Sequence, residues 1–368
     1  MDETVRYGLR KILIAIVYCL GVLVFFEATA RVVLWTDWGF GRIVGGLWLP
    51  LQETDDTAWR LSFVRRHSQE SPITYKFDIY HPTRGWAVRP GLSRVAVFNN
   101  KILSSNSRGL RGSTEYAYEK PPGTLRILTF GDSFTFGDDV SDNETWTYYL
   151  EKLLPGSEVI NFGVHAYGHD QMLLYLQEEG IKYHPDIVIL GFIWSDMERN
   201  VLSFRDYAKP RFVLDGGRLV LTNTPVPRIE ETLARERWRS KFLDLLTMLR
   251  ASYRQRFGEL KSEMEQVTVA LLDEIANTIR AAGAVPIFVY LPSFGEITRP
   301  GMDMWPGERF FFSYCRDRGI QSIYLQRFFL EKLERGVHLK GYGHWDPEEH
   351  RTAAEGIRAY LVEHGVAQ

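Results

Sequence analysis

The chain has few cysteines: Cys19 and Cys315 are the only two in 368 residues. Cys19 lies inside an N-terminal apolar run, so we expect no internal disulfide, and two distant thiols cannot form a zinc site alone. An excess of one charge is also missing, because 44 Lys and Arg nearly balance 46 Asp and Glu, for a net charge of -2. The charge therefore gives no argument for nucleic acid as a partner. Repeats and low-complexity tracts are absent as well.

One long hydrophobic run is present, at the N-terminus. Residues 12–26 are apolar without interruption and follow residues 6–11, which include two arginines and a lysine. This run would span roughly 22 Å as a helix, and its continuation to Trp35 reaches the roughly 30 Å of a bilayer's apolar core. The basic flank indicates a cytoplasmic N-terminus and an exported body. We predict an uncleaved transmembrane anchor over residues 1–35; a signal peptide cleaved near Ala28-Thr29-Ala30 is the alternative.

Two regions with different residue patterns follow the run. Residues 36–123 are rich in Trp, Gly and Pro and contain short β-like runs, which predicts a small β-rich addition. From residue 124 to 368, short apolar runs alternate with helical periodicity. This alternation predicts a three-layer α/β/α domain with a mostly parallel five-stranded sheet. The predicted strands are 125–130, 159–161, 187–192, 287–291 and 322–325.

Residues 200–262 interrupt this alternation and are predicted to be an insertion. A hairpin is expected around Asp215-Gly216-Gly217, followed by a basic amphipathic helix. The apolar stripe of this segment contains Trp238, Phe242, Leu245, Leu249 and Tyr253. We expect the stripe to pack on the domain while the arginines are solvated; contact with a membrane surface or an anionic glycan is the alternative.

The most informative motif follows the first predicted strand of the sheet. Residues 131–137 read Gly-Asp-Ser-Phe-Thr-Phe-Gly and place Ser133 at a strand-to-helix turn. Backbone N–H groups at a helix start can hold an anion, so a serine there is positioned as a nucleophile beside an oxyanion site. Gly-Asp-Ser alone is a common turn. Three further segments fall at strand ends, where parallel sheets bind ligands: residues 161–168, 191–196 and 338–347.

These four segments resemble the sequence blocks of the SGNH/GDSL hydrolase superfamily of serine esterases and acyltransferases. The blocks are Gly131-Asp132-Ser133-Phe134, Asn161-Phe162-Gly163, Gly191 to Asp196, and Gly343-His344. The resemblance covers residues 124–366 and implies a flavodoxin-like fold. It implies Ser133 as nucleophile and His344 as general base. It also implies an oxyanion hole formed by Ser133 and Gly163, with help from Ser195.

Two positions depart from the family pattern. Ser195 stands where the family usually has an asparagine that donates to the oxyanion. Gly341-Tyr342 occupies the positions of the usual aspartate. Three alternatives remain for orienting His344: a backbone carbonyl, an acid such as Asp346 or Asp303, or no partner, as in a Ser–His dyad. We favour the carbonyl or the dyad, because Asp346 is typical of the cap of a following helix.

Other residues near the blocks are expected to have supporting roles. Asp132 is predicted to fix the turn and the helix start, and His165 to line the pocket. The spacing of His165 and His169 lacks a suitable third ligand, so no metal site is predicted. The implied serine chemistry needs neither a metal nor an organic cofactor. Three more residues flank the predicted site: Trp194, Asp196 and Trp345. The two tryptophans fit either stacking on a sugar or core packing.

The order of the regions also resembles a bacterial envelope-associated branch of this superfamily. The shared features are an N-terminal span, a β-rich segment containing residues 106–111, and then the domain. This resemblance implies a single-pass protein of the bacterial inner membrane with a periplasmic catalytic domain. We predict a serine esterase or O-acyltransferase acting on acyl esters such as acetyl groups, on a small ester or an acylated glycan, with envelope polysaccharide machinery as partner. A non-catalytic binding or scaffold protein of a polysaccharide assembly is the alternative.

Overall fold

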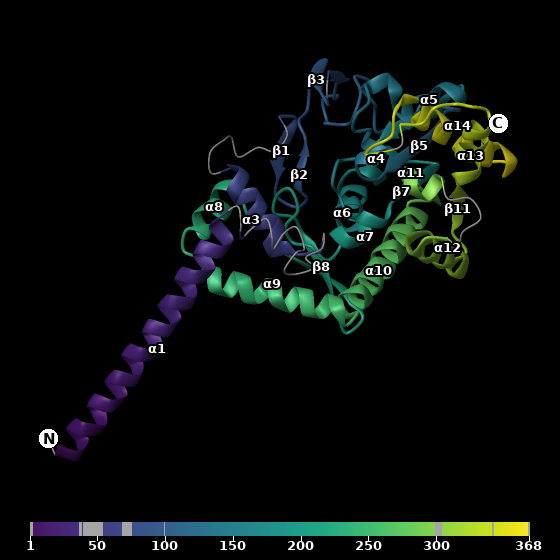
Figure 1. The fold of residues 1–368 in the computed structure, drawn as a ribbon. Coiled ribbons are helices and arrows are strands. Elements are labelled where there is room, and N and C mark those ends of the chain that lie inside the picture. Colours follow the sequence, from purple (N-terminus) through teal and green to yellow (C-terminus); the bar gives the residue numbers. More distant parts are fainter. Residues whose placement is uncertain are drawn as a thin grey trace. The chain divides into compact units, whose positions relative to one another are not determined.

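The computed structural model of the chain describes residues 3–36, 39, 54–67, 76–98, 100–298, 304–340 and 342–366. They form two compact units (Figure 1). The first comprises residues 1–70 and 229–262, and the second comprises residues 71–228 and 263–368. Each unit has a hydrophobic core of its own.

The regular secondary structure of the first unit's described residues is helical. It contains α1 (Glu3–Trp35), α3 (Asp56–His67), α8 (Ile229–Glu236) and α9 (Lys241–Arg256). By length and composition alone, Val5–Trp35 could cross a membrane, and none of its most apolar window is buried. The long apolar helix expected at the N-terminus is therefore present, whereas its insertion in a membrane is a proposal.

The apolar stripe around α9 does not pack as expected. Trp238, Leu249 and Tyr253 are 90%, 43% and 58% exposed. The buried side chains of α9 are instead Lys241, Asp244 and Met248. The expectation that the stripe packs on the domain is wrong for the three exposed residues. The physical reason is that ion pairs to Asp244 hold the opposite side of the helix inward.

The second unit contains a five-stranded parallel sheet of order β11-β10-β7-β5-β6. The strands are β5 (Leu125–Phe130), β6 (Ser157–Asn161), β7 (Ile187–Phe192), β10 (Val285–Tyr290) and β11 (Gln321–Tyr324). Every residue of β7 is buried, as expected for a central strand covered on both faces. The sheet predicted from the sequence is confirmed, and no strand end differs by more than two residues.

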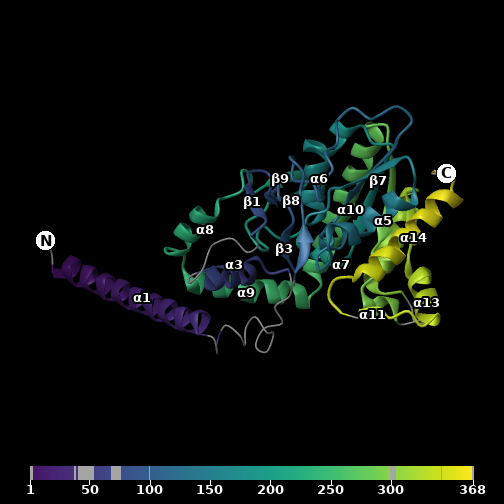
Figure 2. The same ribbon diagram turned by 90° about the horizontal axis from the view of Figure 1, so that it is seen from above.

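Helices cover both faces of this sheet (Figure 2). On one face, α5 (Trp146–Leu153) and α14 (Pro347–Glu363) share a core cluster with alternate strand residues such as Ile189. In both views α6 (His169–Glu178) and α10 (Glu259–Ala281) lie on the other face. The arrangement is the predicted three-layer α/β/α fold.

The order of the strands fixes where a site can form on this sheet. From β5 the chain moves to β6 on one side, and it then returns to β7 on the other side of β5. Ligand crevices in open parallel sheets lie outside the carboxyl ends of the strands, where the strand order reverses. The turns after β5 and β7 therefore meet at the position expected for a site.

The segment before the sheet contains small antiparallel pairs, as its β-like runs indicate. The first pair is β1 (Asp78–His81) with β2 (Gly85–Val88), and the second is β3 (Val95–Val97) with β4 (Lys101–Leu103). A later hairpin joins β8 (Arg211–Asp215) to β9 (Arg218–Thr222) around the predicted turn. All three pairs belong to the second unit.

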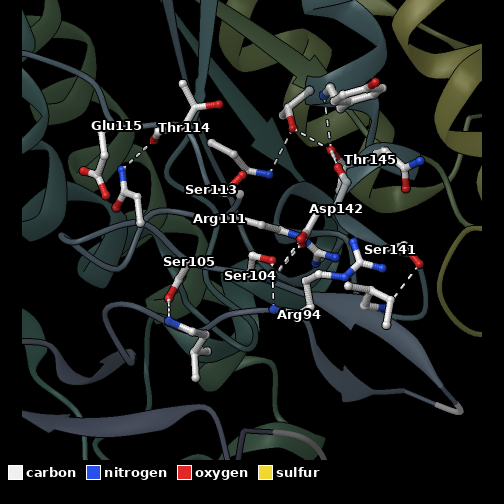
Figure 3. A pocket seen from close by; sticks show the side chains of 18 of the residues that line it. Arg94, Ser104, Ser105, Arg111, Ser113, Thr114, Glu115, Ser141, Asp142 and Thr145 are labelled. Atoms are coloured by element: carbon white, nitrogen blue, oxygen red, sulfur yellow. Dashed lines mark hydrogen bonds and ion pairs between the residues drawn. The ribbon is translucent and has the colours of Figure 1, made fainter.

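Arg111 connects this β-rich segment to the loop that follows the first strand of the sheet. Its Nη1 donates to the carbonyls of Phe136 and Gly137 at 2.8 and 2.7 Å, and its Nη2 donates to the carbonyl of Val140 at 2.7 Å. Its Nε lies 3.4 Å from Oδ1 of Asp142, and Figure 3 shows the two side chains together. Arg111 is buried, so its guanidinium holds the loop after Phe136 from the protein interior.

Replacing Arg111 with methionine should therefore destabilise the second unit. The substitution leaves three buried carbonyls without their donor, and we expect a loss of about 3 kcal/mol in the free energy of unfolding. Urea or thermal unfolding of the full chain in detergent measures the effect. Arg94→Met is the matched control, since Arg94 is an exposed arginine of the same segment and should change stability by less than about 0.5 kcal/mol. Equal stability of the two variants would contradict the anchoring role.

Candidate active site

Ser133 lies at the turn between β5 and the short helix α4 (Ser133–Phe136). Asp132 is the N-cap of α4, and its Oδ1 accepts the backbone N–H of Phe134 at 3.0 Å. Gly131 is required by close packing, because a Cβ there would lie 2.1 Å from Oγ1 of Thr135. The turn thus presents Ser133 at the carboxyl end of β5.

His344 brings the C-terminal part of the chain to Ser133. Its Nε2 lies 2.9 Å from the Ser133 Oγ, a distance suited to proton transfer. Phe134 packs against the imidazole, with ring centroids 5.4 Å apart. When Nδ1 carries the ring proton, Nε2 can accept the hydroxyl proton of Ser133, as a general base must.

Two acids from the loop after α4 face the imidazole ring. Oδ2 of Asp139 lies 3.8 Å from Nδ1 of His344, and Oδ2 of Asp138 lies 4.0 Å from Nε2. Sequence reasoning missed both, because it sought the acid beside the histidine. The signal that could have found them is the acidic pair in Gly137-Asp138-Asp139, directly after the nucleophile helix.

Of the two acids considered from the sequence, Asp346 serves elsewhere. Asp346 caps α14 as predicted, since its Oδ1 accepts the N–H groups of Glu348 and Glu349, each at 2.9 Å. Asp303 lies outside the described residues. In the part of the chain that the structure describes, Asp139 is therefore the carboxylate nearest to Nδ1 of His344.

Asp138 and Asp139 have different surroundings. Burial raises the pKa of Asp138 to about 6, although nearby cations including Arg111 oppose the rise. Asp139 is partly exposed, and its Oδ2 lies 3.0 Å from Nζ of Lys340. The ammonium group of Lys340 holds this carboxylate in place beside His344.

A buried ion network ties the nucleophile turn to α7 (Trp194–Arg199). Nη1 of Arg199 lies 2.9 Å from Oδ2 of Asp132 and 2.8 Å from Oδ1 of Asp196. Burial and the neighbouring Asp132 carboxylate raise the pKa of Asp196 well above its usual range. Oδ2 of Asp132 also lies 3.2 Å from the Ser133 Oγ, so the network reaches the Ser133 hydroxyl. Arg199 belongs to none of the four blocks, and sequence reasoning missed it.

The backbone at Gly163 packs directly on α4. A Cβ at this position would lie 2.3 Å from the backbone nitrogen of Phe136, so only glycine fits. The N–H of Gly163, which the sequence analysis assigned to the oxyanion hole, donates to Oδ1 of Asn161 at 2.8 Å. The N–H of Ser133 makes no hydrogen bond to any described residue. Of these two N–H groups, the one of Ser133 is therefore the one that can donate to an oxyanion without first breaking a hydrogen bond to a described residue.

The first turn of α7 carries two other residues expected at the site. Ser195 is half-buried there. Trp194 is also half-buried, and its Nε1 donates to Oε1 of Glu198 at 3.2 Å. Both side chains are thus partly accessible from the turn that follows β7.

His165 and Trp345 lie in the core. His165 is 1% exposed, and its Nε2 lies 3.3 Å from Oδ2 of Asp78 in β1. The expectation that His165 lines the pocket is corrected, because this ion pair draws the ring inward beneath the β-rich segment. Trp345 is buried, donates from Nε1 to the carbonyl of Pro292 at 3.0 Å, and belongs to the main core cluster. The sequence allowed Trp345 either to stack on a sugar or to pack in the core, and its position agrees with core packing.

A polar cavity of about 800 Å³ lies beside β6 (Figure 3). Its lining includes Arg111, Asp142, Thr147 and Asn161. Nδ2 of Asn161 donates to the carbonyl of Thr135 in α4 at 2.9 Å, so one wall contacts the nucleophile helix. Ser133 and His344 do not line this cavity.

Comparison with known proteins identifies similar structures but no sequence relatives. No protein-family model and no curated protein matches the chain. A member of the lipolytic protein G-D-S-L family from Veillonella parvula is 13% identical, with a TM-score of 0.38, over 65% of this chain and 98% of that one.

Two other similar structures come from Desulfitobacterium hafniense and Geobacillus stearothermophilus. The first, a putative lipolytic protein of the G-D-S-L family, is 14% identical with a TM-score of 0.36, over 64% of this chain and 99% of that one. The second, a catalytic mutant of the acetylxylan esterase Axe2, is 16% identical with a TM-score of 0.37, over 65% of this chain and 93% of that one. At these values no residue role follows from the similarity.

The buried His165 should make stability depend on pH. Burial alone would lower the pKa of His165, but the carboxylates of Asp78, Asp138 and Asp206 raise it to about 9. Because this exceeds the roughly 6.5 of an unfolded histidine, the stabilisation is complete below about pH 6.5 and is lost as the pH rises through about 9.

We expect the free energy of unfolding to fall by up to about 3 kcal/mol between these pH values. Denaturant unfolding at several pH values measures this fall. His165→Gln should remove most of it, whereas His338→Gln, at an exposed histidine, should leave it intact. An equally steep fall in His165→Gln would contradict the assignment.

Proposed function

We propose that the second unit is a serine esterase or O-acyltransferase that works through an acyl-Ser133 intermediate. The observation that carries the proposal is the 2.9 Å separation of the Ser133 Oγ and the His344 Nε2. The pair lies at the carboxyl end of β5, where the strand order reverses. A hydroxyl nucleophile beside an imidazole base is the arrangement required for acyl transfer.

In the proposed first step, the Ser133 Oγ attacks the carbonyl carbon of an ester while Nε2 of His344 takes the hydroxyl proton. The carbonyl oxygen becomes an oxyanion, to which the N–H of Ser133 and the hydroxyl of Ser195 donate. The bond to the alcohol then breaks, and His344 returns the proton to the leaving oxygen. In the second step, His344 deprotonates water or a sugar hydroxyl, whose oxygen attacks the acyl carbonyl carbon. The bond from that carbon to the Ser133 Oγ breaks, and His344 returns the proton to Oγ.

Asp139 is proposed to set the orientation of His344 in this cycle. Its Oδ2 faces Nδ1 at 3.8 Å, which is longer than a hydrogen bond, but catalytic contacts are often long without substrate and tighten when it binds. A carboxylate at Nδ1 keeps the ring proton on that nitrogen and leaves Nε2 free to act as base. The acid would thus come from the nucleophile loop instead of from the usual position before the histidine.

The substrate is proposed to be an acyl ester, such as an acetyl ester, of an envelope polysaccharide. The polar cavity beside β6 supports a hydroxyl-rich ligand, because hydroxyl and charged side chains can bond sugar hydroxyl groups. The long apolar helix α1 supports a membrane anchor, and its basic N-terminal flank favours an exported second unit. The proposed location in the inner membrane and the proposed polysaccharide machinery as partner rest on the sequence resemblance alone.

A non-catalytic scaffold role is the second candidate. It is favoured by the bond between the Gly163 N–H and Asn161, which occupies a donor that the oxyanion would use. It is also favoured by Ser195 standing in place of a fixed amide donor. On this alternative the protein binds an acylated glycan without turning it over.

Labelling with a serine-reactive fluorophosphonate separates the two candidates. We expect the full chain to be labelled, and Ser133→Ala to abolish labelling and lower p-nitrophenyl acetate hydrolysis by at least about 10³. Ser262→Ala, at an exposed serine that does not line the cavity, is the control and should behave as the native protein. If the native chain is not labelled and glycan binding survives Ser133→Ala, the scaffold role is correct instead.

Asp139→Asn should lower kcat by about 10² or more while leaving KM nearly unchanged, because the group acts on His344 and not on the substrate. Steady-state hydrolysis of the same ester measures both constants. Asp346→Ser is the control, since serine preserves a helix cap, and it should retain near-native kcat. A native kcat in Asp139→Asn would show that His344 is oriented by another group or by none.

A further inference from the structure

The side of α9 that faces solvent is apolar. Its exposed apolar residues are Leu243 (60%), Leu246 (44%), Leu249 (43%), Tyr253 (58%) and Phe257 (61%), the last directly after the helix. They recur every three or four positions and therefore lie on one face. Trp238, just before the helix, is 90% exposed. A continuous exposed face of this kind is unusual for a soluble surface and marks a contact with another apolar phase.

Buried charges hold this face outward. Oδ1 of Asp244 lies 2.7 Å from Nη2 of Arg60 in α3, and Oδ2 of Asp244 lies 3.1 Å from Nζ of Lys241. Glu236 of α8 also pairs with both of these cations. Rotating α9 to bury its leucines would break the pairs to other helices, Asp244 with Arg60 and Lys241 with Glu236, and a buried charge that loses its partner is strongly destabilising. The outward apolar face is thus a fixed property of the first unit.

The exposed face of α9 begins beside Phe26 and Glu27 of α1. The carboxylate of Glu27 accepts the Ser240 hydroxyl at 2.7 Å and caps α9 by accepting the N–H groups of Lys241 and Phe242 at 3.1 and 3.0 Å. The rings of Phe26 and Phe242 stack with centroids 5.3 Å apart. In both views α9 leads away from α1 and does not fold back along it (Figures 1 and 2).

Basic side chains accompany the apolar face. Arg250 and Arg256 are exposed on α9 itself, and Arg239 is half-exposed at its N-terminal end. A helix with leucine and aromatic residues on its outer face and arginines beside them is typical of helices that lie in the headgroup region of a membrane. The arginines would meet anionic lipid phosphates there.

We propose that α9 is an interfacial helix, lying on the outer surface of the bilayer that α1 crosses. Its apolar face enters the boundary between headgroups and acyl chains, and its arginines contact anionic headgroups. The partner is lipid and not protein, because the apolar face is continuous with the apolar surface of α1 at Phe26 and Phe242 and carries cations beside it. This inference goes beyond the proposed function and is independent of Ser133. It gives the first unit two membrane contacts, which would fix its tilt as well as its attachment.

A depth measurement on the full chain tests the proposal. Leu246→Cys, in a Cys19→Ser background, is labelled with an environment-sensitive fluorophore and reconstituted into vesicles of equal phosphatidylcholine and phosphatidylglycerol. We expect blue-shifted emission and at least about twofold stronger quenching by shallow doxyl-labelled lipids than at the control site. The control is Val362→Cys in the same background, because Val362 of α14 is exposed to a similar extent, 41% against 44%.

A label on the native Cys19 separates this proposal from the anchor itself. Cys19 is exposed on α1, and its label should be quenched by deep doxyl groups when α1 spans the bilayer. Deep quenching at Cys19 with equal quenching at positions 246 and 362 would overturn the interfacial role of α9 and leave the anchor standing. A blue shift at position 246 without lipid quenching would also overturn it, because protein would then cover the face.

A separate variant tests whether the arginines contact anionic headgroups. The double substitution Arg250→Glu and Arg256→Glu should reduce quenching at position 246 in the anionic vesicles by about twofold, and by less in vesicles of phosphatidylcholine alone. If the double substitution reduces quenching equally in both vesicle types, the proposed contact with anionic headgroups is overturned. An unchanged far-ultraviolet circular dichroism spectrum checks that the helices stay folded in this variant.

Discussion

The ion pair between Arg199 and Asp132 is the interaction on which the candidate site depends. Asp132 caps α4 and touches the Ser133 hydroxyl, while Arg199 belongs to the helix that follows β7. One buried guanidinium therefore joins the turns of two adjacent strands at the point where the strand order reverses. If this pair were lost, the cap carboxylate would be buried without its cation, and Ser133 would no longer be held at its distance from His344.

Local patterns were enough to predict the fold from the sequence. The run 187–192 is apolar throughout, and it forms a strand with those ends and every residue buried. Asp346-Pro347 shows the residue preferences of a helix start, and it is one. Such signals succeed because burial on both faces of a parallel strand, and capping of a helix, depend on residues next to each other in the chain.

The parts that the sequence did not predict depend on contacts between distant segments. Asp139 approaches His344 only because the loop after α4 and the loop before α14 meet in space. Arg111 gives no local sign that it will bond three carbonyls of that loop. The stripe of α9 was visible as a periodic pattern, but periodicity shows which residues share a face and not what covers that face.

Both units use buried charge where hydrophobic packing alone could not fix the geometry. Burying ions is expensive, and an apolar replacement is often as stable, so such networks are best understood as specifying one arrangement among several. In the second unit, Arg199 and two aspartates position the polar turn at Ser133. In the first unit, Arg60, Lys241 and Asp244 hold α9 in the orientation that keeps its leucines outside. The exposed apolar face of α9 is therefore held in place by ion pairs on the opposite side of the helix and not by packing of its leucines.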